Sequence, residues 1–186
     1  SGDPHDRWDV VAFSVPFEPL YVNVARALLA LGIEPEREHR NNESAQVLIG
    51  GIAPTLNPVP ASVLADTVFA GEVEHAAVEA VIRMAAQNNK TGAAEKLTPM
   101  SGMKIPGANS AAPRFILSRD QIESSMVTGY DDQSAGVFDC AGLVEVGRGC
   151  GRGCRFCAAG FAYLPVRHRT VDAILHDVAT YRGTTD

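Results

Sequence analysis

Apolar residues in the first half of the chain recur with two different periods, which predicts strands that alternate with helices. The run DVVAFSV (residues 9–15) is short and rich in β-branched residues, as expected of a buried strand. It is followed by YVNVARALLALG (residues 21–32), whose apolar residues recur at helical spacing until Gly32 ends the pattern. Two further strands are predicted, AQVLIGG at residues 45–51 and ADTVFAGE at residues 65–72.

The third strand passes into a helical pattern at residues 73–87, and Val78, Val81, Ile82 and Ala85 are expected to line one face of that helix. Between the second and third strands, APTLNPVP (residues 53–60) contains three prolines, and we predict an irregular loop there. Strands that alternate with helices favour parallel pairing with right-handed crossovers. The fold class predicted for residues 1–88 is therefore α/β, with a partial doubly wound, Rossmann-like parallel sheet.

Beyond residue 88 the pattern changes. Residues 89–138 are rich in Gly, Pro, Ser and Asn and predict a linker, with a domain boundary between Asn88 and Pro113 and a short strand RFILS inside it. Residues 139–186 predict a second domain with the order strand (AGLVEV), cysteine-rich loop and helix. We expect Thr170 to cap this helix and Gly183 to end it. One such unit cannot bury its own apolar faces, so we expect it to be the opening βα unit of a larger barrel or sheet.

Glycines follow the predicted parallel strands of the first domain. In open α/β sheets, ligands bind beyond the carboxyl ends of the strands, where Gly50, Gly51 and Gly71 lie. A glycine lets a ligand approach the backbone closely. The alternative is that these glycines only form turns, because neither a dinucleotide-binding pattern nor a phosphate-binding loop is present.

Composition narrows the class of protein. Hydrophobic residues make up 46% of the 186 residues and charged residues 20%, which indicates a folded protein. The net charge of −6 does not favour binding to nucleic acid or to an anionic membrane, both of which are negatively charged. No apolar run approaches the ~18 residues of a membrane span. We therefore expect a cytoplasmic protein that does not enter a membrane. Positive charge is concentrated locally, because residues 148–169 hold five arginines, one histidine and no acid.

Three cysteines lie in the sequence GRGCGRGCRFC with the spacing C-x3-C-x2-C, at Cys150, Cys154 and Cys157. Structural zinc needs a fourth ligand, for which Cys140 or His168 would have to serve at an unusual spacing. A ferredoxin-type carrier favours C-x2-C-x2-C, and disulfides among thiols this close would be strained. Three thiolates on a cluster of four irons leave one iron open, as in a catalytic site. Alternating glycines would let the loop wrap a cluster, and these are Gly147, Gly149, Gly151 and Gly153. The arginines would offset the negative charge of the cluster, and for Arg167 and Arg169 a solvated basic face is an equal alternative.

The stretch RGCGRGCRFC, between a strand and a helix, resembles the cluster loop of the radical S-adenosylmethionine (SAM) enzymes. Residues 9–86 and 141–183 together resemble the subgroup that carries an N-terminal cobalamin-binding-like domain before a partial TIM barrel. The resemblance implies that Cys150, Cys154 and Cys157 hold a 4Fe-4S cluster, that Phe156 lies near the adenine of SAM, and that an electron donor of the flavodoxin or ferredoxin type reduces the cluster. It also implies a cobalamin beside Gly50, Gly51 and Gly71, while the substrate stays undefined.

Some features depart from that pattern. The cobalt-ligand pattern D-x-H-x-x-G is not intact, because Trp8 stands where the glycine belongs after Asp3 and His5, and we interpret His5 as a chance match. The remaining SAM-binding segments would lie beyond Asp186, so the chain by itself is expected to be inactive. Two other functions stay open: a radical SAM methylthiotransferase acting on tRNA, although no cysteine precedes Cys140, and a non-catalytic zinc or iron-sulfur electron-transfer module. Cys140 itself is interpreted as a small buried residue.

Overall fold

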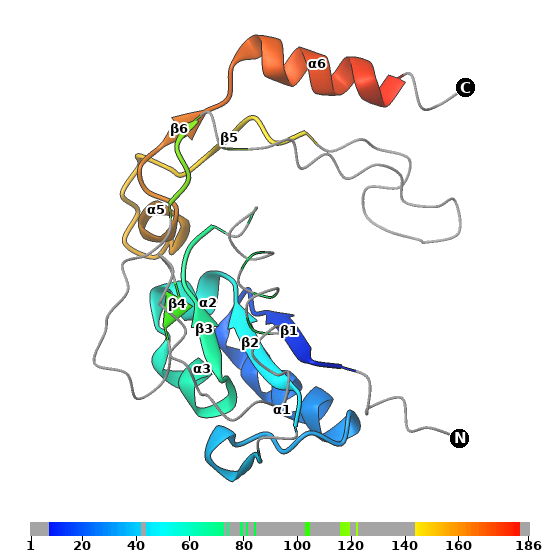
Figure 1. The fold of residues 1–186 in the computed structure, drawn as a ribbon. Coiled ribbons are helices and arrows are strands. Elements are labelled where there is room, and N and C mark those ends of the chain that lie inside the picture. Colours follow the sequence, from blue (N-terminus) through cyan, green and yellow to red (C-terminus); the bar gives the residue numbers. More distant parts are fainter. Residues whose placement is uncertain are drawn as a thin grey trace. The chain divides into compact units, whose positions relative to one another are not determined.

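The structure is a computed structural model. It describes residues 8–41, 44–72, 74, 79, 81, 84, 103–104, 116–119, 122 and 144–182. The chain divides into two compact units, Ser1–Ile116 and Leu117–Asp186. Each unit is described by itself below, with the elements labelled as in Figure 1.

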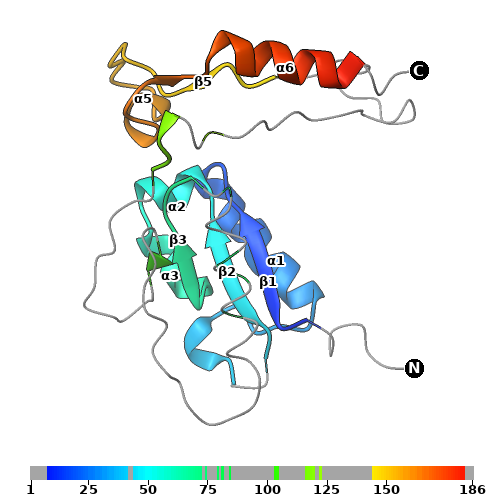
Figure 2. The same cartoon turned by 45° about the horizontal axis from the view of Figure 1, so that its top comes forward.

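The first unit contains a four-stranded sheet in the order β1-β2-β3-β4. Strands β1 (Val10–Ser14) and β2 (Gln46–Gly50) pair in parallel over their whole length, and β2 pairs in parallel with β3 (Thr67–Phe69). The three parallel strands run side by side in Figure 2. This confirms the α/β class and the parallel strands predicted from the apolar pattern.

Strand β4 (Met103–Lys104) pairs antiparallel with β3, and it comes from the segment predicted to be a linker. The sequence pattern predicted no strand at these two residues, and the prediction of a linker over residues 89–138 is otherwise left as it stands. A two-residue strand carries no periodicity of its own, so only its partner can reveal it. Residues 116–118 of the predicted strand RFILS adopt no regular structure.

Helix α1 (Tyr21–Ala30) follows a short 3₁₀ helix, η2 (Glu18–Leu20), and ends as its sequence predicts. Gly32 has a φ of +69°, and the amide of Ile33 donates to the carbonyl of Leu28 across 2.9 Å. This is the Schellman arrangement, in which a glycine in the left-handed region lets the chain satisfy the last carbonyls of a helix. A second 3₁₀ helix, η3, covers Arg37–His39.

The proline-rich stretch forms two short helices, α2 (Ile52–Leu56) and α3 (Val59–Leu64), so the prediction of an irregular loop was wrong. Pro58 and Pro60 occupy the N-cap and the first turn of α3, and Pro54 lies in the first turn of α2. Amides in the first turn of a helix have no partner within that helix, so proline costs nothing there.

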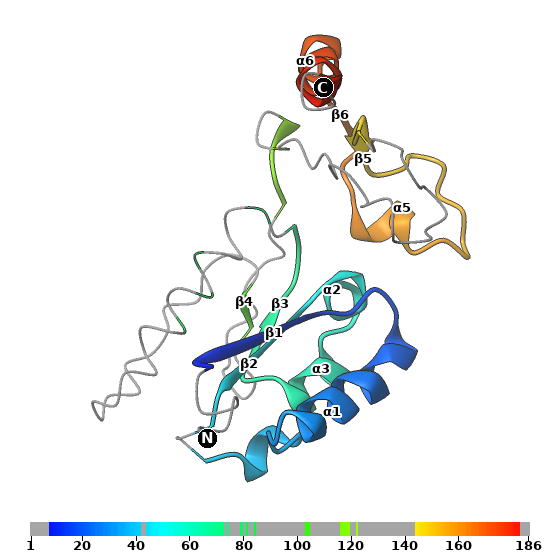
Figure 3. The ribbon, with the colours of Figure 1, turned by 90° about the vertical axis from the view of Figure 1, so that its right-hand side faces the viewer.

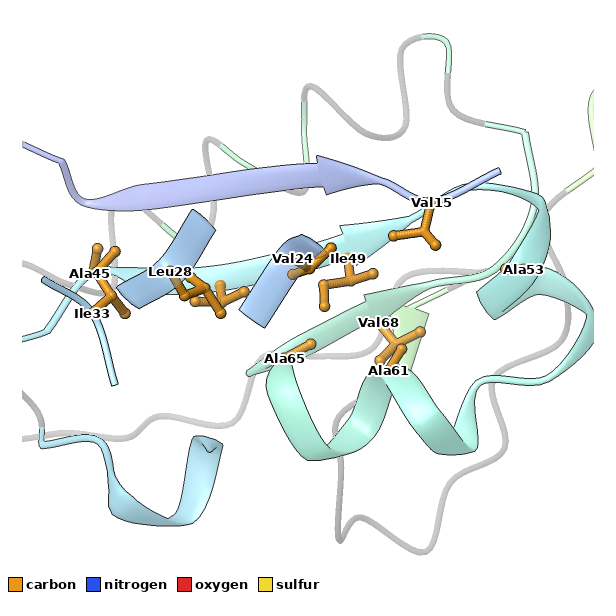
Figure 4. Packing of buried hydrophobic residues seen from close by; sticks show 11 residues of the cluster. Val15, Val24, Leu28, Ile33, Ala45, Ile49, Ala53, Ala61, Ala65 and Val68 are labelled. Carbon is orange, nitrogen blue, oxygen red and sulfur yellow. The ribbon is translucent and has the colours of Figure 1, made fainter. Parts of the chain in front are cut away.

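An apolar core lies on one face of the sheet. Helices α1 and α3 lie on the same side of the parallel strands in Figure 3. Side chains from strands and helices interlock there, as Figure 4 shows for Val24 and Leu28 of α1 against Ile49 of β2. Side chains on the opposite face of β2 and β3 are buried as well, as Leu48, Thr67 and Phe69 show. Of the helix predicted over residues 73–87, the four described positions are helical: Glu74, Glu79, Val81 and Met84.

In the second unit, β5 (Gly147–Arg148) pairs antiparallel with β6 (Arg167–His168). A short helix, α5 (Ala159–Ala162), lies between them in sequence, and α6 (Val171–Arg182) follows β6. The strand expected at residues 141–146 is not formed at residues 144–146, because the pairing begins only at Gly147. Thr170 caps α6 as predicted, since its hydroxyl oxygen accepts the amide of Ala173 at 3.2 Å.

Candidate functional site

The three clustered cysteines lie on residues 149–158, which we call the cysteine loop. It leaves β5, enters α5, and returns to β6, so the two-stranded pair closes its base. Inside the loop, the amide of Cys157 donates to the carbonyl of Cys154 across 3.1 Å, which draws these two cysteines into one turn. Cys154 is exposed, Cys150 and Cys157 are partly exposed, and all three are free thiols.

The three thiols fit iron by their chemistry. Thiolate sulfur is the ordinary protein ligand of iron-sulfur clusters. Each of the three cysteine residues is at least partly exposed to solvent. Within the ranges that the structure describes, no group of three or more His, Cys, Asp and Glu side chains already stands gathered around a metal position. The donor set therefore suits the metal, and the loop would have to draw the three sulfurs together around it.

Two positions near the cysteine loop have to be glycine, because backbone atoms of residues 163–168 occupy the space that a Cβ would need. A Cβ on Gly149 would lie 2.5 Å from the carbonyl oxygen of Tyr163, and Gly149 also has a φ of +87°. A Cβ on Gly147 would lie 2.6 Å from the carbonyl oxygen of Arg167. Gly153 has a φ of +63° but open space around it, so its backbone conformation rather than close packing favours glycine there. Close chain packing thus explains two of the four glycines that the sequence assigned to wrapping a cluster.

The arginines divide by burial, and the division differs from the sequence interpretation. Arg167 and Arg169, for which a solvated basic face was as plausible as any role at a cluster, are buried. Arg167 donates to the carbonyls of Leu117 (2.6 Å) and Pro165 (2.9 Å). Arg148 makes a bidentate ion pair with Glu145, at 2.6 and 2.9 Å. Arg152 and Arg155 are the exposed arginines of the loop.

Phe156, expected near the adenine of SAM, is 93% exposed. A ring this open is free to stack on a planar ligand, and that role stays a prediction. His168, weighed as a fourth zinc ligand, is an exposed residue on β6. Cys140, the other residue weighed for that role, lies outside the described residues, as do Asp3 and His5.

The glycines at the strand ends of the first unit are brought together by Thr55. Its hydroxyl donates to the carbonyl of Gly51 at 2.7 Å and accepts the amide of Gly71 at 3.0 Å. The ends of β2 and β3 are therefore joined on the carboxyl side of the sheet, where a ligand site was predicted.

The same glycines also have structural reasons to be glycine. A Cβ on Gly51, which has a φ of +108°, would lie 2.6 Å from the carbonyl oxygen of Val15, and one on Gly50 would touch Phe69 at 3.6 Å. Gly71 has a φ of +131°. The turn explanation therefore accounts for Gly51, whereas a binding role for any of the three stays a prediction.

Sequence reasoning missed three residues that organise these sites: Thr55, Glu145 and Asp177. Thr55 gave no signal, because it lies within the stretch predicted to be irregular. Glu145 and Asp177 lie outside the acid-free stretch of residues 148–169, so the sequence showed the arginines without their partners.

Comparison with known proteins bears on the first unit. A sequence model of the N-terminal part of radical SAM proteins matches residues 1–107, more than half of the chain. The chain belongs to the radical SAM proteins. No curated protein and no solved structure matches it.

The radical SAM match and the cysteine spacing come from different parts of the chain. The matched residues 1–107 contain none of the three clustered cysteines, which begin at Cys150. Two separate segments thus point to the same family. In the described part of the chain, no helix is long and apolar enough to cross a membrane.

Proposed function

We propose that the chain is part of a radical SAM enzyme in which Cys150, Cys154 and Cys157 hold a 4Fe-4S cluster. The observation that carries this proposal is the arrangement of the loop: three free thiols with C-x3-C-x2-C spacing on an exposed loop, in a chain of the radical SAM family. When bound, such a cluster supplies the electron that cleaves SAM into methionine and a 5′-deoxyadenosyl radical, which abstracts a hydrogen atom from a substrate.

The chain's own residues would contribute binding and electrostatics. The three thiols must lose their protons to bind iron, so the site favours nearby positive charge. Arg152 and Arg155 stand beside Cys154 in the loop and are exposed, whereas Arg148, Arg167 and Arg169 are engaged elsewhere in the unit. We assign the compensation of the cluster's negative charge to Arg152 and Arg155. Phe156 is free to cover the adenine of SAM.

Anaerobic reconstitution with iron and sulfide tests this proposal. We expect about four irons for each chain and a broad iron-sulfur absorption that Cys154→Ala abolishes. Cys140→Ala is the matched control, because it removes a cysteine outside the loop and should leave the absorption intact. Stoichiometric zinc without that absorption, lost on Cys140→Ala as well, would instead identify a structural zinc module.

We also propose, from the family resemblance, that cobalamin binds at the carboxyl ends of β2 and β3. Gly71, with its left-handed backbone and its hydrogen bond to Thr55, is the glycine best placed to support it. Titration with hydroxocobalamin is expected to change the cobalamin spectrum and to retain the cofactor on gel filtration. Gly71→Val should weaken this binding, with Gly32→Val, a change at another left-handed glycine, as the control. Absence of any retention by the wild-type protein would remove cobalamin from the proposal.

The electron donor and the cytoplasmic location stay proposals of the same kind, and the proposal names no substrate. A flavodoxin- or ferredoxin-type donor follows from the need for one electron at the cluster. The tRNA methylthiotransferase alternative calls for a second cysteine triad ahead of the cysteine loop. Within these 186 residues no cysteine precedes Cys140, so the sequence gives that alternative no support.

A further inference from the structure

Arg169 connects three segments of the second unit that are distant in sequence. Its guanidinium Nη1 lies 2.7 Å from Oδ2 of Asp177 on α6 and donates to the carbonyl oxygen of Glu145 at 3.0 Å. Its backbone amide donates to the carbonyl of Val146, also at 3.0 Å. The side chains of Arg169 and Asp177 are only 6% and 8% exposed, so this ion pair is shielded from water and salt.

Glu145 extends this connection to the cysteine loop. Its carboxylate holds Arg148 through two hydrogen bonds, while its carbonyl accepts Arg169. Arg148 is the last residue of β5, and the cysteine loop begins at the next residue. A continuous path therefore runs from α6 to the residue that precedes the loop, through two ion pairs that are joined by the backbone carbonyl of Glu145.

We propose that Arg169 is a positioning residue of the cysteine loop, which it ties to α6 through Asp177. Both contacts are made by the same guanidinium nitrogen, Nη1, which donates a hydrogen bond to the carbonyl of Glu145 and forms an ion pair with the carboxylate of Asp177. A buried ion pair is costly to leave half-made, because the remaining charge stays without its partner. The ion pair thus holds the base of the cysteine loop in place in the folded unit. Because the loop is anchored there, the positions of the three thiols are restricted as well.

This inference rests on the proposed function only for the identity of the metal, and its first test needs no metal. The full chain is prepared without iron, and the rates at which Cys150, Cys154 and Cys157 react with an alkylating reagent are measured by mass spectrometry. Asp177→Asn is expected to raise these rates above those of the wild-type chain. Asp172→Asn, the same change at an exposed position of the same helix, is the matched control and should leave them unchanged.

The second test measures iron after reconstitution. Loss of a group that orients metal ligands typically lowers metal affinity about 10–100-fold, so chelator competition should show at least about a 10-fold loss for Asp177→Asn. Arg169→Lys keeps the charge but replaces the planar guanidinium that places Nη1 between Asp177 and Glu145. It is expected to show the same two effects. The electron paramagnetic resonance spectrum of the reduced protein should change shape in both variants, which a loss of stability alone would not produce.

The outcomes separate this inference from the proposed function. Alkylation rates for Asp177→Asn equal to those of the wild-type chain would overturn it, whatever the iron content. Faster alkylation together with a wild-type chain that takes up no iron would remove the proposed function and support this inference. If Asp177→Asn loses helix content, the variant Asp177→Glu provides the test, because it keeps the negative charge at this position. Alkylation rates of the thiols in Asp177→Glu that stay above those of the wild-type chain would contradict the role of the ion pair.

Discussion

Tyr21, the first residue of α1, is partly buried and packs against the apolar core of the first unit. Within the described residues its hydroxyl oxygen is buried and has no hydrogen-bond partner. Burial, and to a smaller extent the negative charge of Glu18, raises the pKa of the Tyr21 phenol above its ordinary value. The folded chain therefore keeps this proton longer than the unfolded chain does as the pH rises.

Tyr21→Phe tests this at the residue scale. Above the ordinary tyrosine pKa of about 10, unfolding releases a proton, so the stability contributed by neutral Tyr21 is complete below that pH and is lost as the pH rises through the folded pKa. Tyr21→Phe is expected to leave the melting temperature at neutral pH unchanged or higher, because it removes an unpaired buried hydroxyl. It should also reduce the fall in melting temperature at about pH 10.5.

Tyr163→Phe, which removes a partly exposed phenol of the second unit, is the control for that measurement. The interpretation of Tyr21 would be wrong if Tyr21→Phe lost stability at neutral pH by as much as a core truncation does.

Other single residues show that one residue type serves different purposes in different surroundings. Gly149 must be glycine because the chain at Tyr163 occupies the space of its Cβ, whereas Gly153 has open space around it. Arg169 is buried in an ion pair, whereas Arg152 and Arg155, three residues apart in the same loop, face solvent. Spacing along the sequence carries no information about burial, so only the structure could separate the buried members of each set from the exposed ones.

At the scale of elements, Arg40 joins the segment after α1 to the end of α3. It donates to the carbonyls of Glu34, Pro35 and Leu64 and pairs with Asp66 at 3.2 Å. The side chain of Arg40 is 3% exposed and that of Asp66 is 29% exposed. Asp66 also accepts the amide of Val47 on β2 at 2.8 Å, so one carboxylate anchors two elements.

Asp66→Asn is expected to lower the free energy of unfolding by about 2 kcal/mol, since hydrogen bonds to charged groups contribute about 1.5–3 kcal/mol and the charge on Arg40 would lose its partner. Denaturant titration measures the change. Glu36→Gln breaks the exposed pair with His39 and should change the free energy by less than about 0.5 kcal/mol. Equal effects of the two substitutions would contradict the anchoring role of Asp66.

Longer elements were easier to predict than shorter ones. The periodicity of α1 covers ten residues, and its glycine stop was confirmed. The helices α2 and α3 have five and six residues, too few to show an amphipathic period, and their prolines masked them. Strands β4, β5 and β6 have two residues each, so their existence depends entirely on the partner strand.

At the scale of the whole molecule, the chain has two compact units. The family match and the cysteine spacing lie in different units. The family match ends at residue 107, within Ser1–Ile116, whereas the cysteine loop belongs to Leu117–Asp186. The match shows the family, and the loop supports the proposal about chemistry. Neither defines a substrate.

The sequence by itself determined the α/β class, the parallel order of the first strands and the positions of the three cysteines. These depend on local periodicity and on spacing, which are readable along one chain. Only the tertiary structure decided that β4 pairs antiparallel, that the cysteine loop is closed at its base by β5 and β6, and that Arg167 and Arg169 are buried. The physical reason is that burial, strand pairing and the partners of a charge depend on segments far apart in sequence, such as Glu145 and Asp177 meeting at Arg169.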